Sequence, residues 1–213
     1  MKLKYFITRL SVASFSFIDG IQQYRLDDGR VHFMLIPGGE DVHPSLYKEN
    51  KGKHSVVNLN TDEFEQRLIK KVSNGTLKVG IGRGAHLLTA LAGGKIIQHV
   101  NNNEHVTQII ETADGEIKMS KKHHQMMYPN DVDHVLIGWA KTNRSTVYLN
   151  GENENFELPK DFKEPEIVYY PKINALCIQG HPEWGMGSNE DVKNMRKYVN
   201  ALIKNYVNFK NDI

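Results

Sequence analysis

Cysteine is almost absent from this sequence, in which Cys177 is the single example among 213 residues. One cysteine excludes an internal disulfide framework and a zinc site built from several cysteines, and it fits a reducing compartment. The sequence also lacks an apolar run approaching the roughly 20 residues that cross a bilayer. Its N-terminal apolar stretch is interrupted by Thr8 and Arg9, which argues against a secretory signal. We therefore predict a globular, cytoplasmic protein with no membrane partner.

A strong charge of either sign is missing as well. The 27 lysine and arginine residues are nearly balanced by 25 aspartate and glutamate residues, the net charge is +2, and the two signs are interspersed. This balance predicts a mixed, solvated surface and no nucleic-acid partner. The sequence contains no internal repeat and no low-complexity tract, and its length suits one large core. We therefore expect a single domain over residues 1–213.

Two short apolar runs, each ended by glycines, predict strands that are buried on both faces of a parallel sheet. The first run covers residues 31–36 and leads into Pro37-Gly38-Gly39. The second covers residues 77–81 and leads into Gly82-Arg83-Gly84. Because parallel strands present their carboxyl ends at one edge of a sheet, both glycine turns are expected to lie beside the reactive groups.

Amphipathic periodicity predicts three helices. The first begins at Asp62, the second follows Gly84 and ends at Gly93-Gly94, and the third begins near Ser188. The cap candidates and the apolar stripe of the first helix are Asn60, Thr61, Phe64, Leu68, Ile69 and Val72. Helices that alternate with strands predict an α/β fold with a mainly parallel central sheet flanked by helices.

The remaining strands are predicted in less regular surroundings, and several are expected to be antiparallel or peripheral. They are placed at residues 4–8, 95–98, 106–111, 134–140, 166–170 and 175–179. The stretch from Ser11 to Gln22 leaves little room for the usual first helix of such a fold and receives no assignment.

The spacing of Gly80-Ile81-Gly82-Arg83-Gly84 is that of a nucleophile elbow, in which glycines permit a strained turn that projects the central side chain above the sheet. An anion would be stabilised there by the helix dipole. Three glycines also fit an ordinary strand-to-helix turn or a phosphate-binding loop, and these alternatives remain open.

Two further turns carry groups that suit the same chemistry. His181 follows an apolar run and precedes Glu183 by two residues, a spacing that suits a base and the carboxylate that orients it. Backbone N–H groups of Gly38 and Gly39 can form an oxyanion hole. Taken one at a time, a loop histidine followed by a proline-initiated turn explains His181 and Glu183 better, and a plain turn also explains Gly38 and Gly39.

Taken together, these segments resemble the class I glutamine amidotransferase family, including its γ-glutamyl hydrolase branch, over most of the chain. The matching segments occur in the family's order, at residues 36–47, 62–65, 80–94, 120–125 and 179–183. The resemblance implies a flavodoxin-like fold and a Cys–His–Glu triad that attacks the side-chain amide of glutamine or a γ-glutamyl compound, with no cofactor. His181 and Glu183 stand at the triad's histidine and glutamate.

The resemblance also assigns residues around the triad. Arg83 belongs to the elbow, and the segment that lies beside the substrate pocket in the family is represented here by His123, His124 and Gln125. The paired histidines lack a third ligand at a diagnostic spacing, so we predict no metal site. A family member of this size works with a separate ligase or synthetase, which is the implied protein partner.

Two positions depart from the family's pattern. Gly82 stands where the family has its nucleophilic cysteine, and His86 stands where the family commonly has a glutamine that helps to hold the substrate. Cys177 lies within an apolar strand and is expected to be a buried structural residue rather than a replacement nucleophile.

Three functional hypotheses follow from Gly82. The chain is an enzyme whose native cysteine has been replaced by glycine, or a natural pseudoenzyme that binds a γ-glutamyl or related small molecule or regulates a ligase. In the third hypothesis the glycine turn binds phosphate or another anion through its N–H groups. In each case the chain as written is expected to be close to inactive in thioester chemistry.

Overall fold

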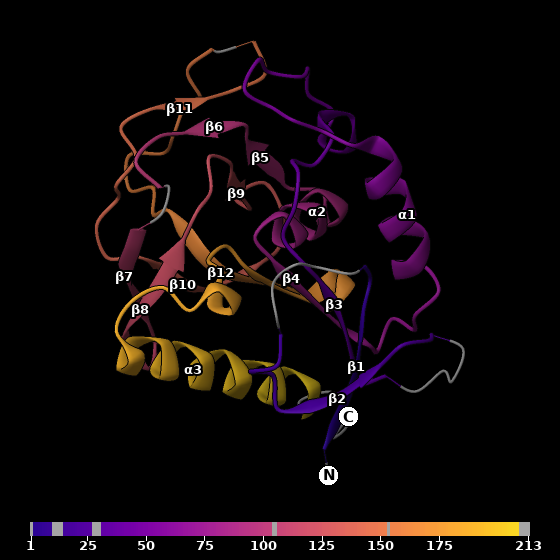
Figure 1. Ribbon diagram of the computed structural model, residues 1–213. Helices are drawn as coiled ribbons and strands as arrows, with labels where there is room; N and C mark the ends of the chain where they lie inside the picture. Colours follow the sequence, from indigo (N-terminus) through magenta and orange to yellow (C-terminus); the bar gives the residue numbers. More distant parts are fainter. Residues whose placement is uncertain (1, 10–14, 27–30, 104–105, 153, 209–213) are drawn as a thin grey trace.

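The computed structural model describes residues 2–9, 15–26, 31–103, 106–152 and 154–208 (Figure 1). Its centre is a nine-stranded sheet with the strand order β2-β1-β3-β4-β13-β12-β10-β7-β8. The strands of this sheet are β1 (Leu3–Ile7), β2 (Gly20–Gln23), β3 (Phe33–Ile36), β4 (Leu77–Ile81), β7 (Val106–Thr112), β8 (Gly115–Lys121), β10 (Val135–Ala140), β12 (Pro165–Tyr170) and β13 (Ala175–Ile178).

The half of the sheet from β2 to β13 is parallel throughout. All residues of β3, β4 and β13 are buried, because helices cover both faces of these strands. This is why their sequences are nearly continuous apolar runs, and the strands predicted at residues 31–36, 77–81 and 175–179 are confirmed. The fold is a single-domain α/β fold with a mainly parallel central sheet flanked by helices, as predicted.

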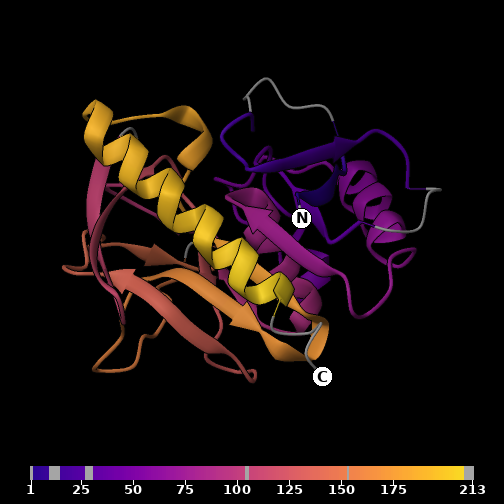
Figure 2. The same cartoon turned by 90° about the horizontal axis from the view of Figure 1, so that it is seen from below.

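Three helices form the outer layers. In Figures 1 and 2, α1 (Leu59–Ile69) and α2 (Arg83–Ala92) lie on one face of the sheet, and α3 (Asn189–Asn208) crosses the other face. The hydrophobic clusters agree with this layering. Met195 and Val199 of α3 belong to the same hydrophobic cluster as Leu35 of β3, whereas Leu87 of α2 belongs to the cluster of Met34, the neighbouring residue of that strand. Alternate residues of β3 therefore serve opposite cores.

The other half of the sheet is antiparallel, as expected for several of the later strands. Two small sheets, β5 with β9 and β6 with β11, lie beside it. Their strands and the three short 3₁₀ helices are β5 (Lys95–Ile97), β6 (His99–Val100), β9 (Met126–Tyr128), β11 (Tyr148–Leu149), η1 (Pro44–Tyr47), η2 (Pro171–Ile173) and η3 (Pro182–Trp184). The sequence indicated β5 but not β6, β8, β9 or β11. Strands β6, β9 and β11 have only two or three residues each, too few to show the alternation of a strand.

Helix α1 differs most from its prediction. It begins at Leu59, with Asn58 as the N-cap accepting a hydrogen bond from the Thr61 backbone, rather than at Asp62. Phe64, expected on the buried stripe, is 44% exposed, and the fully buried residues of the helix are Asp62 and Glu65. The apolar stripe therefore predicted the wrong buried face of α1. Asp62 and Glu65 can be buried because arginine side chains neutralise them, as described below.

Of the N-terminal stretch from Ser11 to Gln22, which received no assignment, residues 11–14 lie outside the described residues. Its described part includes β2, which pairs in parallel with β1 at the edge of the sheet. Among the helices in the described parts of the chain, none combines the length and the apolar character needed to cross a membrane.

Candidate active site

The glycine elbow joins β4 to α2 by a sharp turn. Gly82 has φ +54° and ψ −117°, a backbone conformation that side chains of L-residues rarely adopt. Its N–H donates to the Ile178 carbonyl of the neighbouring strand at 2.9 Å, and its carbonyl accepts from the Ala85 N–H at 2.9 Å. The turn is therefore fixed between the sheet and the first turn of the helix, and it has the backbone shape in which a nucleophile elbow presents its side chain.

His181 and Glu183 lie directly beside this turn. The imidazole Nδ1 is 2.7 Å from Glu183 Oε1, and the ring stacks on Trp184 with 3.8 Å between centroids and 3° between planes. The His181 N–H donates to the Ser120 carbonyl at 2.8 Å, and the Ser120 hydroxyl donates back to the His181 carbonyl. The base and the orienting carboxylate proposed from the sequence are thus held together by main-chain and side-chain contacts.

The ring of His181 occupies the space that a side chain at position 82 would need. A Cβ added to Gly82 would lie 2.8 Å from His181 Nε2 and closer still to Cε1. Real Cβ atoms essentially never approach so closely, so a cysteine at this position requires the ring to move. The His181 ring can therefore take this position because Gly82 has no side chain.

The first glycine loop, which contains Gly38 and Gly39, also lies beside the His181 ring. A Cβ on Gly38 would come within 3.1 Å of His181 Cε1, so this glycine lets the loop pack against the ring. The Gly38 carbonyl accepts a hydrogen bond from the Arg9 guanidinium, which also binds Glu65 Oε1 through Nε at 3.1 Å. Gly39 is exposed at the rim of the cavity described below. The loop is therefore joined through Arg9 to Glu65 of α1.

Arg83 does not present its guanidinium freely to a ligand. It forms ion pairs with Asp62 and Glu65, both fully buried, and only 3% of its own side chain is exposed. Burial lowers the pKa of Arg83 and the Asp62 carboxylate opposes this shift. With Arg9 on Glu65, two positive and two negative groups form a neutral cluster. What Arg83 can offer a ligand is its main-chain N–H in the first turn of α2, which has no intrahelical acceptor.

A cavity of about 350 Å³ opens above the elbow. All the site residues proposed from the sequence line it except Gly38 and Glu183, which support His181 from behind. Its walls also include residues to which the sequence assigned no role: Glu40, Asp41, Val56, Lys122 and Trp184. The structure thus brings segments separated by more than a hundred residues into one pocket at the carboxyl ends of β3, β4 and β13.

Asp41 connects two walls of this cavity. Its Oδ2 accepts from the Val56 N–H at 2.9 Å, and its Oδ1 lies 3.1 Å from Nε2 of His124. The first glycine loop is therefore joined to the segment that carries His123, His124 and Gln125. Among the described residues no group of three or more histidine, cysteine, aspartate or glutamate side chains is arranged to hold a metal ion.

His86 and His123 are buried histidines in the cavity wall, with exposures of 4% and 6%. Burial lowers the pKa of His86 to about 4, although its hydrogen bond to Gln179 and the nearby Asp41 oppose the shift. Burial also lowers the pKa of His123 well below its usual range, and Lys121 adds to this effect. Both imidazoles are therefore neutral at neutral pH.

We expect the free energy of unfolding to fall as the pH drops through the interval between about 6.5, the pKa of an unfolded histidine, and about 4. In this interval His86 is protonated in the unfolded chain but stays neutral in the folded chain. A pKa shift of this size lowers the free energy of unfolding by about 3 kcal/mol over the interval. Urea unfolding at a series of pH values measures the decline. The variant His86→Gln should show a shallower slope, and His134→Phe, which alters a histidine away from the cavity, should not. An equal slope in the parent and His86→Gln proteins would contradict the assignment.

Cys177 lies fully buried in β13, where burial raises the pKa of its thiol, as expected for a structural cysteine. Besides the wall residues named above, of which Trp184 stacks on His181, the sequence reasoning gave no role to Asp62 and Glu65, which neutralise Arg83. The arginine within a glycine turn was the signal that could have revealed the carboxylates, because a charge held against a buried strand needs a partner.

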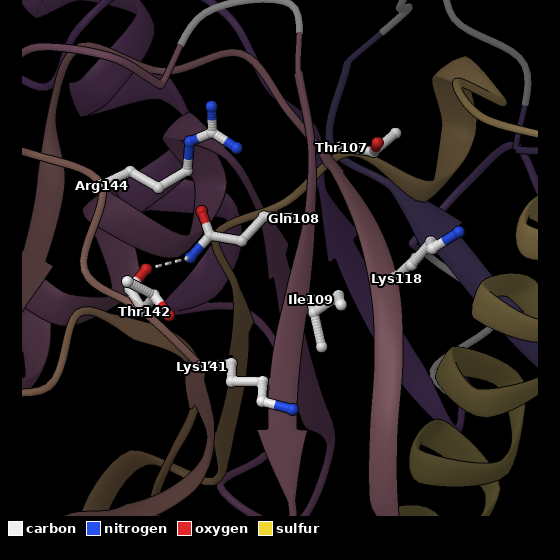
Figure 3. A pocket seen from close by; sticks show the side chains of 7 residues that line it. All are labelled: Thr107, Gln108, Ile109, Lys118, Lys141, Thr142 and Arg144. Carbon is white, nitrogen blue, oxygen red and sulfur yellow. Dashed lines mark hydrogen bonds between the residues drawn. The ribbon is translucent and has the colours of Figure 1, made fainter.

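A second hollow of about 370 Å³ lies on the antiparallel half of the sheet, and Figure 3 shows its side chains. Gln108 donates to the Thr142 carbonyl at 3.4 Å, the contact drawn as a dashed line. Its lysines are paired with acidic residues, Lys118 with Asp191 at 3.3 Å and Lys141 with Glu116. Arg144 also lines this hollow, and none of the site residues proposed from the sequence does, so the elbow cavity is the candidate site.

The sequence profile of the peptidase C26 family matches residues 22–147, more than half of the chain. The chain belongs to the peptidase C26 family. The matched region contains the first glycine loop, the elbow with Gly82, and His86, His123, His124 and Gln125. No curated protein matches the sequence significantly.

Solved structures extend the likeness of this peptidase C26 protein to the whole fold. A protein from Thermoplasma acidophilum, described as a subunit of GMP synthase, aligns with a TM-score of 0.60 at 11% identity, over 99% of this chain and 98% of the other. A glutamine amidotransferase from Thermotoga maritima aligns with a TM-score of 0.54 at 10% identity, over 99% and 94%. PurLQS from Thermotoga maritima gives 0.50 at 14% identity, over 95% and 100%. The fold is therefore that of the class I glutamine amidotransferases.

Proposed function

We propose that this protein binds glutamine or a γ-glutamyl compound in the elbow cavity and does not cleave its amide through a thioester. The observation that carries the proposal is the pairing of Gly82 with His181. The residue that would supply the nucleophile has no side chain, and the imidazole fills the space beside it. The first glycine loop, His181 and Glu183 remain around this point.

The proposal makes the chain a pseudoenzyme of its family. A histidine and a carboxylate without a nucleophile retain little of a triad's rate, because loss of the nucleophile alone costs about six orders of magnitude in a comparable serine triad. The alternative, an enzyme whose native cysteine was replaced by glycine, is supported by the retained His181 and Glu183. A native glycine codon at position 82 of the source gene would exclude that alternative.

Binding is tested by isothermal titration of the protein with L-glutamine and with γ-glutamylglycine. In the same samples, release of ammonia from glutamine and release of glycine from γ-glutamylglycine are followed. We expect saturable binding with both products at the background level. The variant Val56→Trp, which places a large ring at the cavity wall, should weaken binding about tenfold or more. Val135→Trp changes another exposed valine, away from the cavity, and should bind as the parent does. The absence of binding by both compounds would refute the proposed function.

Restoring the thiol gives a second test. The variant Gly82→Cys is expected to release ammonia from glutamine at the background rate and to lose about 1–3 kcal/mol of stability, because the positive φ and the clash with His181 both oppose the side chain. An ammonia assay with and without glutamine, together with urea unfolding, measures both effects. Robust ammonia release would show that only the thiol is missing and would favour the enzyme hypothesis.

We further propose that residues 1–213 act as one amidotransferase-like domain in the cytoplasm and that its protein partner is a separate ligase or synthetase. Two of the structural neighbours, PurLQS and the GMP synthase protein from Thermoplasma acidophilum, motivate the partner. Their identity to this chain is low, so the partner is proposed from the fold and the resemblance rather than from a shared interface.

A further inference from the structure

A third cavity lies along the C-terminal half of α3. Its volume is about 720 Å³, against about 350 Å³ for the elbow cavity, and the two cavities share no residue among the described ones that line them. Its walls come from α3, from β10 and β12, and from the turn between β7 and β8. We call it the aromatic cavity, because four rings line it: Trp139, Tyr169, Tyr198 and Tyr206.

The rings of this cavity are not closed into the core. Trp139, Tyr198 and Tyr206 are half-buried, and Val135, which also lines the cavity, is 48% exposed. Tyr206 contacts Tyr169, with 4.3 Å between the ring centroids and 38° between the planes. Because the faces of aromatic rings carry partial negative charge, these walls combine apolar area with an attraction for a cation.

The charge of the aromatic cavity is also negative. Burial raises the pKa of the Tyr198 phenol, and the Asp114 carboxylate raises it further. Burial raises the pKa of Tyr169 and Tyr206 as well, so all three phenols are uncharged at neutral pH. Of the described residues that line the cavity, Asp114 alone is charged, and the described part of the chain offers its carboxylate no ion pair.

The Trp139 ring already holds one cation. Lys163, which does not line the cavity, places its Nζ 3.9 Å from the centroid of the indole ring. The indole N–H donates to Glu111 Oε2 at 2.8 Å, so a carboxylate beside the same ring offsets the charge of this lysine. The negative charge of Asp114 therefore remains available to a ligand.

We propose that the aromatic cavity binds an organic cation whose charge lies on an alkylated ammonium group. Such a group presents apolar methyl or methylene groups to the rings and is attracted by their faces and by Asp114. A fully alkylated nitrogen has no N–H donor that needs an acceptor, which suits walls made mostly of apolar and aromatic side chains. This ligand is additional to the one proposed for the elbow cavity and does not depend on it.

Other classes of ligand fit these walls less well. A metal ion or a simple ammonium ion is strongly hydrated and would find a single carboxylate in place of its water. An anion would face Asp114 and the negative faces of the rings. A neutral apolar compound would gain from the apolar area but not from the charge, so a neutral probe of the same shape separates it from the cation.

Three probes of similar shape test the proposal. Choline has a trimethylammonium head, neohexyl alcohol has a carbon in place of its nitrogen, and ionised tert-butylacetic acid carries a carboxylate. Their binding is followed by NMR titration of the two indole N–H signals, which the variant Trp184→Phe assigns. Choline is expected to shift the Trp139 signal saturably and to bind about tenfold or more tightly than the alcohol, with the carboxylate the weakest.

The signal of Trp184, a residue of the elbow cavity, serves as the internal reference and should not move with choline. A saturable shift of Trp184 alone would overturn the proposal, because choline would then bind in the elbow cavity. The absence of a saturable shift of Trp139, or an alcohol that binds as tightly as choline, would also overturn it.

Two variants assign the preference to the walls of the cavity. Asp114→Asn removes the single charge of the lining at an exposed position, so choline should bind about threefold or more weakly while the alcohol binds as before. Glu157→Gln makes the same change of charge at an exposed residue that lines neither cavity and should bind as the parent does.

Tyr206→Leu keeps an apolar side chain and removes one ring, so the preference for choline over the alcohol should fall to about twofold or less. Thermal melting verifies that each variant is folded, and Asp114→Asn, altered at an exposed turn, keeps the test decisive if Tyr206→Leu is not. A full preference for choline that remains in either folded variant would overturn the proposal.

Discussion

Replacing Glu65 with alanine is expected to lower the free energy of unfolding by about 3–5 kcal/mol. Glu65 is fully buried and binds Arg83, Arg9 and the Thr8 hydroxyl, the last at 2.6 Å. Its removal leaves Asp62 as the single carboxylate for two arginines in a low-dielectric environment. Breaking a buried ion pair from one side costs far more than the pair itself contributes, because the remaining charge is stranded.

The matched control for this variant lies on the same helix. Glu63 is about half exposed and its carboxylate is 3.7 Å from Arg67, so Glu63→Ala should change stability by less than about 1 kcal/mol. Urea unfolding of the two variants beside the parent protein measures the difference. Similar losses in both variants would mean that the cluster of Arg9, Arg83 and the two carboxylates contributes no more than a surface pair.

Replacing Gly84 with alanine is expected to have the second large effect, a loss of about 3 kcal/mol or more. The new Cβ would lie 2.7 Å from the Ile36 carbonyl carbon and closer still to its oxygen. Both atoms belong to the main chain of β3, which is buried on both faces and cannot yield as a flexible side chain would. Helix α2 would have to move away from the sheet, and the elbow with it.

Gly75→Ala serves as the comparison for this substitution, because a Cβ at this exposed position meets nothing nearer than Ser73 Oγ at 3.7 Å. We expect its melting temperature to stay within about 2 °C of the parent, whereas Gly84→Ala should melt well below it. If Gly84→Ala unfolds like Gly75→Ala, the close packing of α2 on β3 is not needed for stability.

These two predictions concern the same piece of architecture. Glu65 holds Arg83 at the start of α2, and Gly84 lets that start approach β3, so both residues determine where Gly82 and its N–H neighbours lie. The candidate site is therefore supported by a charged cluster on one side and by main-chain packing on the other. If either variant loses ligand binding, that loss is compared with the change in its free energy of unfolding, because an unfolded site cannot bind.

Much of the site was predictable because its signals are local. A buried strand followed by glycines predicts a sharp turn into a helix, and this prediction is confirmed at β4, Gly82 and α2. The short spacing between His181 and Glu183 predicted a hydrogen-bonded pair, and the structure places these groups 2.7 Å apart. Neither signal depends on distant parts of the chain, since each arises from the conformations open to a few successive residues.

The prediction of α1 shows where this reasoning stops. The apolar period favoured Phe64 as an inward residue, but the inner face is occupied by Asp62 and Glu65. Their burial depends on Arg9 and Arg83, which come from other elements. Periodicity measures apolar character along one segment and contains no information on a partner that neutralises a charge from elsewhere.

The sequence by itself determined the α/β class, the parallel half of the sheet and the sharp turn at Gly82 between a strand and a helix. Only the tertiary structure decided that His181 fills the space beside Gly82, that Arg83 is neutralised rather than free, and that His86, His123 and Gln125 line one cavity. The physical reason is that a side chain's charge state, tautomer and free volume depend on atoms that distant strands bring within a few ångströms.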